Sequence, residues 1–321
     1  MKFSAAVIGL GNMGQGFDYD IQDDSRVLTH ASGFHYHPRF QLLAGTDPDP
    51  VARERFTKKY QQPAFPTLRE LYENVTPDVV AIAVPTPLHY SVFQEVLRYS
   101  PRGVILEKPM AKTLAEAKKM VQLAGEAHCA LLVNYLRRFE PGVLALKQRI
   151  TAGECGDIYK GVLWYSKGIA NNGSHFIDLL LFLLGAAGEA VILNKGRDLP
   201  DPEPDVQIRF GEVDCYLLAG REECFSVKEL ELMATRASIK YLLGGAKILI
   251  HKTRPHPMFA NYTVLEESGV ELRTDLEHYQ LHVLEALYQH LTSGYPLNST
   301  GVTALSTMAV LDQIARRIRG D

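Results

Sequence analysis

Short apolar, β-branched runs alternate with helical patterns over the first ~140 residues, an order typical of β-α-β units. The runs are almost continuously apolar, which indicates strands buried on both faces and therefore a parallel sheet. We expect these strands at Phe3–Ile8, Gln41–Gly45, Val79–Val84, Gly103–Leu106 and Ala130–Tyr135. Helices are expected between them, for example at Leu68–Glu73, Tyr90–Tyr99 and Leu114–His128.

The pattern changes after Pro141. Apolar and polar positions then alternate, which favours an antiparallel sheet with one exposed face. A helix at Val143–Ile150 precedes strands near Ile158–Tyr165, Val206–Phe210, Val213–Leu218, Val227–Met233 and Ile248–His251. Closing helices are expected at Leu276–Leu291, ended by Gly294, and at Val302–Ile318, with Ser299 or Thr300 as N-cap. The predicted α/β architecture is a doubly wound parallel sheet in residues 1–138, followed by an α+β domain with a mostly antiparallel, open-faced sheet in residues 139–321.

Composition excludes several classes of protein. The chain has 321 residues, with 46% hydrophobic residues, and its 34 basic and 37 acidic residues leave a net charge of −3. A disordered chain is excluded, and no basic surface is expected to hold a nucleic acid. The apolar stretches are shorter than the ~20 residues that a membrane span needs, so we expect a cytoplasmic protein. The chain has four cysteines, which are Cys129, Cys155, Cys215 and Cys224. They form no CxxC pair, and we interpret them as small buried side chains.

The first chemical motif is Gly9-Leu10-Gly11-Asn12-Met13-Gly14, directly after the first expected strand. In this position Gly9 allows a tight turn, Gly11 lets the backbone approach a pyrophosphate, and Gly14 lets the following helix pack on the sheet. The amides at the start of that helix, around Asn12 and Met13, meet the phosphate charge. The motif therefore predicts a dinucleotide-binding Rossmann domain.

Asp47 is the candidate for the acidic residue that binds the ribose of the dinucleotide. It follows the second strand but lies 33 residues after Gly14, where ~20 is usual, so we place an insertion in Phe17–Pro38. A carboxylate accepts hydrogen bonds from both ribose hydroxyls and repels a 2′-phosphate, which favours NAD over NADP. Arg53 and Arg55 lie near enough in sequence to weaken that preference.

The expected insertion carries its own polar side chains, which are Asp18, Asp20, Asp23, Asp24, His30, His35 and His37. The aspartates do not follow a calcium-loop spacing, so we interpret them as a solvated loop and predict no metal site. The histidines have no matched carboxylate and are interpreted as surface residues. A loop at this place in the fold could act as a lid over the cofactor.

Four further segments carry a family resemblance: Val84-Pro85-Thr86-Pro87-Leu88-His89-Tyr90, Leu106-Glu107-Lys108-Pro109, Asn134 to Pro141, and Gly173-Ser174-His175-Phe176-Ile177-Asp178. Together with the glycine motif they resemble the Gfo/Idh/MocA (glucose–fructose oxidoreductase and inositol dehydrogenase) family. The resemblance covers roughly residues 3–185 by motif. It implies a cofactor surface that includes Pro85, Thr86, His89 and Glu107, and substrate contacts from Tyr135 and Arg137.

The resemblance gives Lys108 a catalytic role between nicotinamide and substrate. The physical chemistry agrees, because a lysine at the carboxyl end of a parallel strand lies where such sheets bind ligands. Its ammonium group can polarise a hydroxyl or carbonyl oxygen and share its proton. A structural ion pair with Glu107 or another carboxylate is the alternative. For His89, a structural role and a cofactor-binding role remain equally open.

His175 is the candidate general base. With Ser174 as the N-cap of a helix over Phe176–Leu184, His175 would lie in the first turn, where the helix dipole favours a neutral imidazole. Asp178 shares that helix face and could orient the ring. Many dehydrogenases of this family carry an aspartate where this chain has Asn171. Asn171 can bind a sugar hydroxyl but cannot relay a proton.

These features predict an NAD-dependent oxidoreductase that acts on a hydroxyl or ketone of a sugar, cyclitol or sugar derivative, including nucleotide sugars. Lys108 and His175 would handle the hydroxyl proton. The resemblance also implies a homodimer or homotetramer assembled through the open sheet face. Two alternatives remain open: a dinucleotide-binding sensor without turnover, which Asn171 favours, and an NAD-assisted glycosidase.

Overall fold

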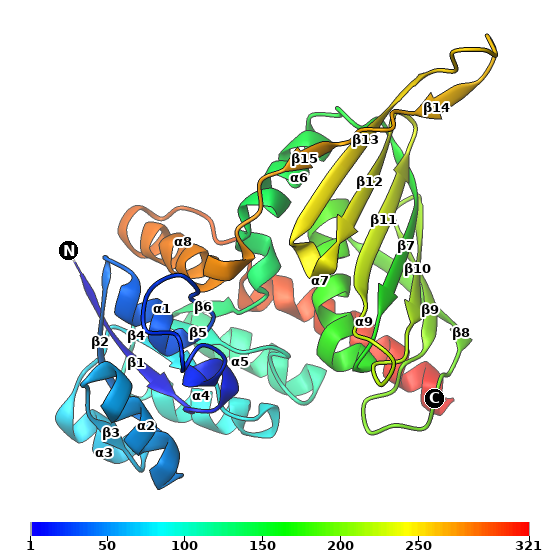
Figure 1. The fold of residues 1–321 in the computed structure, drawn as a ribbon. Coiled ribbons are helices and arrows are strands. Elements are labelled where there is room, and N and C mark those ends of the chain that lie inside the picture. Colours follow the sequence, from blue (N-terminus) through cyan, green and yellow to red (C-terminus); the bar gives the residue numbers. More distant parts are fainter. Residues whose placement is uncertain (1, 321) are drawn as a thin grey trace. The chain divides into compact units, whose positions relative to one another are not determined.

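The computed structural model describes residues 2–320, and these residues form two compact units (Figure 1). The first unit contains the chain up to Phe139 together with Glu277–Met308. The second contains Glu140–Leu276 and the residues from Ala309 onward. The chain therefore leaves the first unit, builds most of the second and returns. Residues 277–308, which the sequence analysis assigns to the C-terminal domain, pack with the first unit.

The first unit is built on the predicted parallel sheet. Its strand order is β3-β2-β1-β4-β5-β6, and each neighbouring pair is parallel. The strands are β1 (Phe3–Ile8), β2 (Phe40–Thr46), β3 (Ala64–Phe65), β4 (Val79–Ile82), β5 (Gly103–Leu106) and β6 (Ala130–Val133). This is the order of a dinucleotide-binding sheet, in which ligands bind beyond the carboxyl ends of the strands near β1 and β4.

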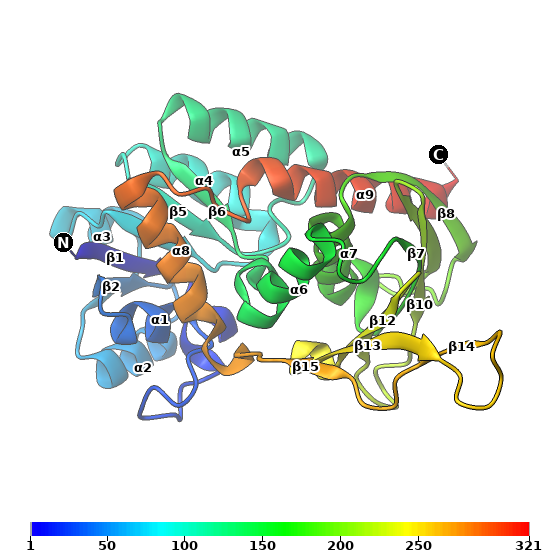
Figure 2. The same cartoon turned by 90° about the horizontal axis from the view of Figure 1, so that it is seen from above.

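Helices cover both faces of this sheet. One face carries α1 (His30–Tyr36), α2 (Pro50–Tyr60) and α8 (Tyr279–Ser293), which follows the short turn η6 (Leu276–His278). The other carries α3 (Leu68–Asn74), α4 (His89–Leu97) and α5 (Leu114–Glu126), and Figure 2 shows α4 and α5 on the side opposite α1 and α2. Phe3, Phe34 and Phe56 pack with Val283 and Leu287 in the core of the first face. The return of the chain as α8 thus completes this core.

The helix expected directly after the glycine motif is interrupted. A wide helical turn, η1 (Asn12–Gly16), is followed by an irregular segment, residues 17–29, before α1 begins at His30. The insertion therefore precedes the helix, and it is shorter than the expected Phe17–Pro38. We call residues 17–29 the inserted loop.

Two expectations about this region are wrong. Asp18 is buried, where a solvated side chain was expected, and it accepts hydrogen bonds from the amides of Leu28 and Thr29 at 2.8 and 3.0 Å. Its carboxylate also accepts from the hydroxyls of Thr29 and Ser32, which form the capping box of α1. His30 and His37 are also buried, whereas surface positions were expected. The carboxylate and the capping box explain how a seven-residue helix starts firmly after an irregular loop.

The second unit contains the predicted, mostly antiparallel sheet. Its order is β14-β13-β12-β11-β7-β10-β9-β8, with β15 paired to β13, and β7 and β10 form a parallel pair. The strands are β7 (Ile158–Tyr165), β8 (Ala187–Asn194), β9 (Asp205–Phe210), β10 (Val213–Ala219), β11 (Lys228–Ala234), β12 (Ala237–Leu242), β13 (Lys247–Pro255), β14 (Thr263–Leu265) and β15 (Val270–Leu272). This confirms the predicted fold class.

One face of this second sheet is covered and the other is open. Residues of α6 (Pro141–Thr151), α7 (Ser174–Leu184) and the end of α9 (Gly301–Arg319) join its inner face in one apolar core. The outer face presents Val162 and Trp164 of β7 beside their β10 partners Tyr216 and Leu218. Trp164 is 46% exposed there. Together with its three neighbours it makes the centre of the outer face apolar.

The cysteines confirm the sequence interpretation at three positions. Cys129, Cys155 and Cys215 are buried, and burial raises the pKa of the Cys129 and Cys215 thiols to about 12. Cys224 differs, because it is exposed.

Candidate functional site

The glycine motif forms a tight turn between β1 and η1. Gly9 has a φ of +90°, and a Cβ there would lie 2.7 Å from the carbonyl carbon of Ala83. A Cβ on Gly14 would lie 2.0 Å from the carbonyl oxygen of Gly9. Both glycines are therefore required by packing inside the protein.

Gly11 differs, because a Cβ there would meet no atom within 4 Å. Packing alone does not require a glycine at this exposed position. The first amides of the following turn, η1, have no partner within that turn, as in any helical start. Close approach of an anionic group to this bare backbone explains the glycine, and a pyrophosphate fits that requirement.

Asp47 lies at the end of β2, beside this turn. Its Oδ2 accepts from the amide of Leu10 at 2.8 Å, and its Oδ1 accepts from the amide of Asp49 at 2.9 Å. Each carboxylate oxygen has a second lone pair for a further donor, such as a ribose hydroxyl. Arg53 donates to the carbonyls of Asp47 and Pro48, both at 2.8 Å, and the Arg55 guanidinium lies over the Tyr19 ring at 4.1 Å.

A cavity of about 730 Å³ in the first unit brings the predicted cofactor residues together. Its walls come from the glycine turn, the end of β2, the segment after β4 and the segment after β5. The predicted cofactor residues that line it are Gly9, Gly11, Asn12, Met13, Asp47, Pro85, Thr86, His89, Glu107 and Lys108. Gly14 lies beneath the turn and is buried. The volume falls within the range of cofactor and small-molecule sites.

His89 begins α4 and is buried at 1% exposure. Its Nδ1 lies 3.0 Å from the carbonyl oxygen of Pro109, and its Nε2 lies 2.9 Å from that of Val84. Burial lowers the pKa of His89, although these carbonyl contacts oppose the shift. The ring thus ties the segment after β4 to the segment after Lys108.

Glu107 and Lys108 follow β5 and differ in exposure. Glu107 is buried at 7% exposure, and its carboxylate accepts from His30 Nε2 at 2.9 Å and Asn134 Nδ2 at 2.7 Å. Lys108 is half-buried and lines the cavity. The sequence analysis did not identify His30 as a partner of Glu107, because no spacing motif links two residues that lie 77 positions apart.

The candidate substrate residues divide between the two units. In the first unit, Tyr135 is buried and Arg137 is half-buried in the short turn η3 (Leu136–Phe139) that follows β6. In the second unit, Asn171 and His175 are half-buried, whereas Asp178 is fully buried three residues after His175.

The start of the helix that carries His175 differs from the sequence prediction. Ser174 is the first residue of α7 and not its N-cap, because the wide turn η4 (Gly168–Gly173) leads directly into the helix. The Ser174 hydroxyl donates back to the carbonyl of Asn171 at 2.8 Å. His175 therefore does not lie at a free helix start, and the dipole argument made for it from the sequence loses its basis.

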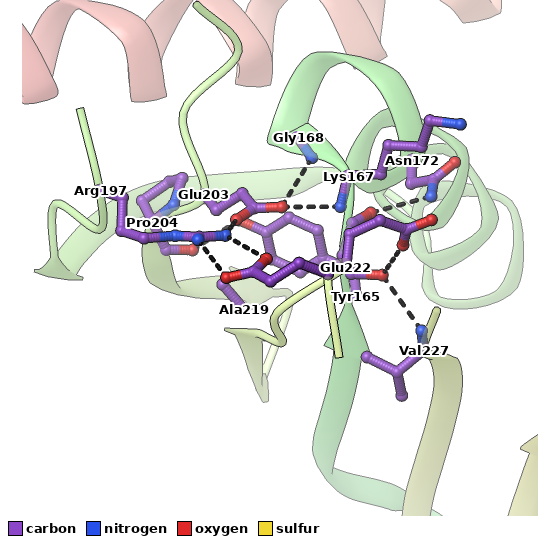
Figure 3. A network of polar contacts seen from close by, with 12 residues as sticks. Tyr165, Lys167, Gly168, Asn172, Arg197, Glu203, Pro204, Ala219, Glu222 and Val227 are labelled. Atoms are coloured by element: carbon purple, nitrogen blue, oxygen red, sulfur yellow. Dashed lines mark hydrogen bonds and ion pairs between the residues drawn. The ribbon is translucent and has the colours of Figure 1, made fainter. Parts of the chain in front are cut away.

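Two carboxylates hold the amides at the start of this wide turn, and Figure 3 shows the contacts made by Glu203. Glu203 accepts from the amides of Lys167 and Gly168 at 2.7 and 3.2 Å. Asp201 accepts from the amides of Ala170 and Asn171, both at 2.9 Å. The segment between β8 and β9 thus fixes the turn that carries Asn171, a contact that no motif in the sequence indicates.

Residues 2–320 contain neither a cluster of metal-binding side chains nor a helix that could span a membrane. There, no set of three or more His, Cys, Asp or Glu side chains gathers in an arrangement suited to a metal ion. In the same residues, no helix is both long and apolar enough to span a bilayer.

Comparisons with known proteins support the sequence resemblance. Residues 3–135 match the Gfo/Idh/MocA model, described as an oxidoreductase family with an NAD-binding Rossmann fold. The scyllo-inositol 2-dehydrogenase (NAD(+)) of Bacillus subtilis is 29% identical over 230 residues, which cover 65% of this chain and 60% of that protein. The inositol 2-dehydrogenase of Rubrobacter xylanophilus is 26% identical over 157 residues, 48% of this chain and 41% of that protein. The chain thus matches about half the length of these curated relatives.

Solved structures share the whole fold at lower identity. The WlbA dehydrogenase of Bordetella pertussis, in complex with NADH and UDP-GlcNAcA, has a TM-score of 0.78 at 18% identity, covering 99% of this chain and 96% of that one. A 3-ketoreductase variant from Actinomadura kijaniata, in complex with TDP-benzene and NADP, has a TM-score of 0.76 at 16% identity, covering 97% and 96%. The family match and the shared fold agree with the glycine turn and cavity described above: residues 3–135 match the Gfo/Idh/MocA family of oxidoreductases with an NAD-binding Rossmann fold, and the whole chain shares the fold of these solved structures.

Proposed function

We propose that this protein is an NAD-dependent oxidoreductase that acts on a hydroxyl or ketone of a sugar, cyclitol or sugar derivative. The observation that carries the proposal is the single cavity lined by the glycine turn, Asp47 and Lys108. The relatives named as inositol dehydrogenases, and the structural neighbour in complex with NADH and UDP-GlcNAcA, support this substrate class.

The chemistry assigned to the chain is proton handling. Bound NAD supplies the acceptor of the hydride that leaves the substrate carbon. Lys108 stabilises the substrate oxygen and exchanges the hydroxyl proton as the C–O bond becomes a carbonyl. His175 is the second proton-handling candidate, and Asn171 would donate to or accept from a substrate hydroxyl. Arg137 and Tyr135 are proposed substrate contacts, while buried Asp178 would act through His175.

The choice of NAD over NADP rests on Asp47. Its carboxylate has lone pairs left for the ribose, and Arg53 and Arg55 are engaged with carbonyls and with Tyr19. We expect Asp47→Asn to weaken NAD binding about tenfold, because a charge-assisted hydrogen bond contributes about 1.5 kcal/mol or more. The gap between NAD and NADP affinity should narrow. A wild-type preference for NADP in fluorescence titrations of the reduced cofactors would overturn the assignment of Asp47.

The direct test of the activity starts from natively purified protein. Mass spectrometry identifies any bound dinucleotide, and nicotinamide absorbance then reports turnover of inositols, hexoses and UDP-sugars. Lys108→Met should lower kcat by about 10²–10⁴-fold with little change in NADH affinity. The matched control is Lys112→Met, four residues away and exposed, which should retain full activity. Equal activity of the two variants would place the proton donor elsewhere.

A sensor that binds the dinucleotide without turnover is the second candidate, and Asn171 favours it. Asn171→Asp places at this position in the turn the carboxylate that many dehydrogenases of the family carry. If this variant gains dehydrogenase activity on substrates that the wild type leaves unchanged, the sensor role is supported. If both are active, the oxidoreductase role stands.

A further inference from the structure

A buried polar network joins the start of α1 to the segment of the first unit that carries Glu107 and Lys108. His30, at the start of α1, is 2% exposed and lies 2.9 Å from Glu107 through its Nε2. Its Nδ1 lies 2.7 Å from Nε2 of Gln280 in α8, which is 1% exposed. Asn134, after β6, donates to the same Glu107 oxygen at 2.7 Å. Four separate parts of the chain are therefore joined in one network, in which His30 and Asn134 contact the Glu107 carboxylate directly.

The partners assign the protons in this network. An ionised carboxylate can only accept, so His30 Nε2 carries the proton that it donates to Glu107, while Nδ1 faces the side-chain amide of Gln280. Burial raises the pKa of the Glu107 carboxyl, but the hydrogen bonds from His30 and Asn134 and the charge of Lys108 outweigh it, so this pKa lies below its ordinary value. Glu107 is therefore held as a carboxylate although it is buried.

Glu107 is also linked to Lys108. The backbone amide of Lys108 lies 3.3 Å from Glu107 Oε2, and both residues line the cofactor cavity. A fixed negative charge beside a lysine stabilises its ammonium form and limits where its side chain can lie.

We propose that His30 is a positioning residue, which holds Glu107 ionised and in place and thereby sets the charge and position of Lys108. The inference rests on the function proposed for Lys108. It assigns a role to α1, whose start the inserted loop and Asp18 fix in place.

Other titratable groups near Glu107 are shared by all the variants compared below. His89, from α4, and Tyr279, from α8, both interact with the Glu107 charge, as does Lys108 itself. Substitutions that leave these three groups in place therefore isolate the contribution of His30.

The experiment measures the reactivity of Lys108 and needs no substrate. Acetic anhydride acylates only the neutral amine, so peptide mass spectrometry of the full chain, labelled across pH 6 to pH 11, gives a labelling midpoint for Lys108. In His30→Leu this midpoint should fall by about one pH unit, because Glu107 loses its donor and its negative charge. Glu107→Gln should produce a similar fall, and the double variant should fall no further. His30→Gln keeps an N–H donor at this place and should recover most of the wild-type midpoint.

The matched control is His37→Leu. His37 is also buried near α1, and its Nε2 lies 3.4 Å from Glu285, but it is not among the residues that line the cavity. Its loss should leave the Lys108 midpoint unchanged. The proposal is overturned if His30→Leu and His37→Leu give the same midpoint, or if the His30 and Glu107 effects add in the double variant. If His30→Leu does not fold, the comparison of His30→Asn with His37→Asn decides in the same way, because the shorter asparagine amide does not reach Glu107 and only His30→Asn should lower the midpoint.

Turnover then separates this inference from the proposed function. With any substrate found active, His30→Leu should lower kcat at least tenfold while the NADH dissociation constant stays within about twofold, and His37→Leu should change neither. Absence of turnover with every substrate, alongside the expected labelling shifts, would count against the oxidoreductase function and leave the His30 linkage supported.

Discussion

His89 and His37 show how burial of a single ring couples stability to pH. Burial lowers the pKa of both side chains below the ordinary 6.5. As the pH falls, the unfolded chain therefore takes up these protons before the folded protein does. Each neutral ring contributes its full stabilisation above about pH 6.5. That contribution is lost as the pH falls from 6.5 through the lower pKa that the ring has in the folded protein.

We accordingly predict that the free energy of unfolding decreases from pH 7.5 to pH 5.5. His89→Gln and His37→Asn should each be less stable at pH 7.5, since polar partners are left unmatched, and each should show a smaller decrease towards pH 5.5. Urea unfolding at the two pH values measures both quantities. Identical pH dependence in the wild type and both variants would contradict this account.

At the residue scale, the sequence identifies residues whose role is local. Gly9 and Gly14 are required by backbone contacts within the turn, and a glycine motif after a strand predicts such contacts. His30 and Asp201 were not predicted as site residues. Their partners, Glu107 and the amides of Ala170 and Asn171, lie 30 to 77 positions away in sequence. Such pairs depend on tertiary packing, which no local pattern encodes.

Elements with a clear apolar pattern were predicted most closely. The bounds of β1, β5 and β7 are those expected, because each is a short apolar or alternating run with turn residues on both sides. The interrupted helix was not foreseen. Its continuation, α1, has seven residues that depend on buried Asp18 and a capping box, and so on the inserted loop before it.

Asp18→Ala tests this dependence. Removing a buried carboxylate that accepts four hydrogen bonds should destabilise the first unit by about 3 kcal/mol, since unmatched buried donors are costly. The control is Asp20→Ala in the same loop, where the side chain is exposed and the variant should unfold like the wild type. Thermal unfolding followed by circular dichroism compares them. If the two substitutions have equal effects, the loop does not anchor α1.

At the scale of the whole molecule, the open sheet face of the second unit is the surface proposed for assembly. Val162 and Trp164 lie beside Tyr216 and Leu218, and the rows continue into charged residues such as Glu231. An apolar centre with a charged rim is typical of a protein interface. We propose, as the family resemblance implies, that a homodimer or homotetramer forms through this face.

Trp164→Glu should therefore shift the protein towards monomer in sedimentation velocity at micromolar concentration. A charge in the centre of the face would be desolvated on association. Tyr295→Glu is the control, because Tyr295 is also an exposed aromatic residue but lies after α8 in the first unit and not on this sheet. A wild-type protein that sediments as a monomer would overturn the assembly proposal.

The return of the chain to its first unit has a consequence for synthesis. The apolar face formed by Phe3, Phe34 and Phe56 needs Val283 and Leu287 from α8 to be covered. Those residues leave the ribosome only after the 137 residues of Glu140–Leu276, a delay of roughly 7–30 s at ordinary elongation rates. One side of the nascent parallel sheet therefore stays uncovered until most of the second unit has been synthesised. Pulse proteolysis of stalled chains should accordingly find the first unit protease-sensitive at residue 270 and resistant once residue 310 has emerged.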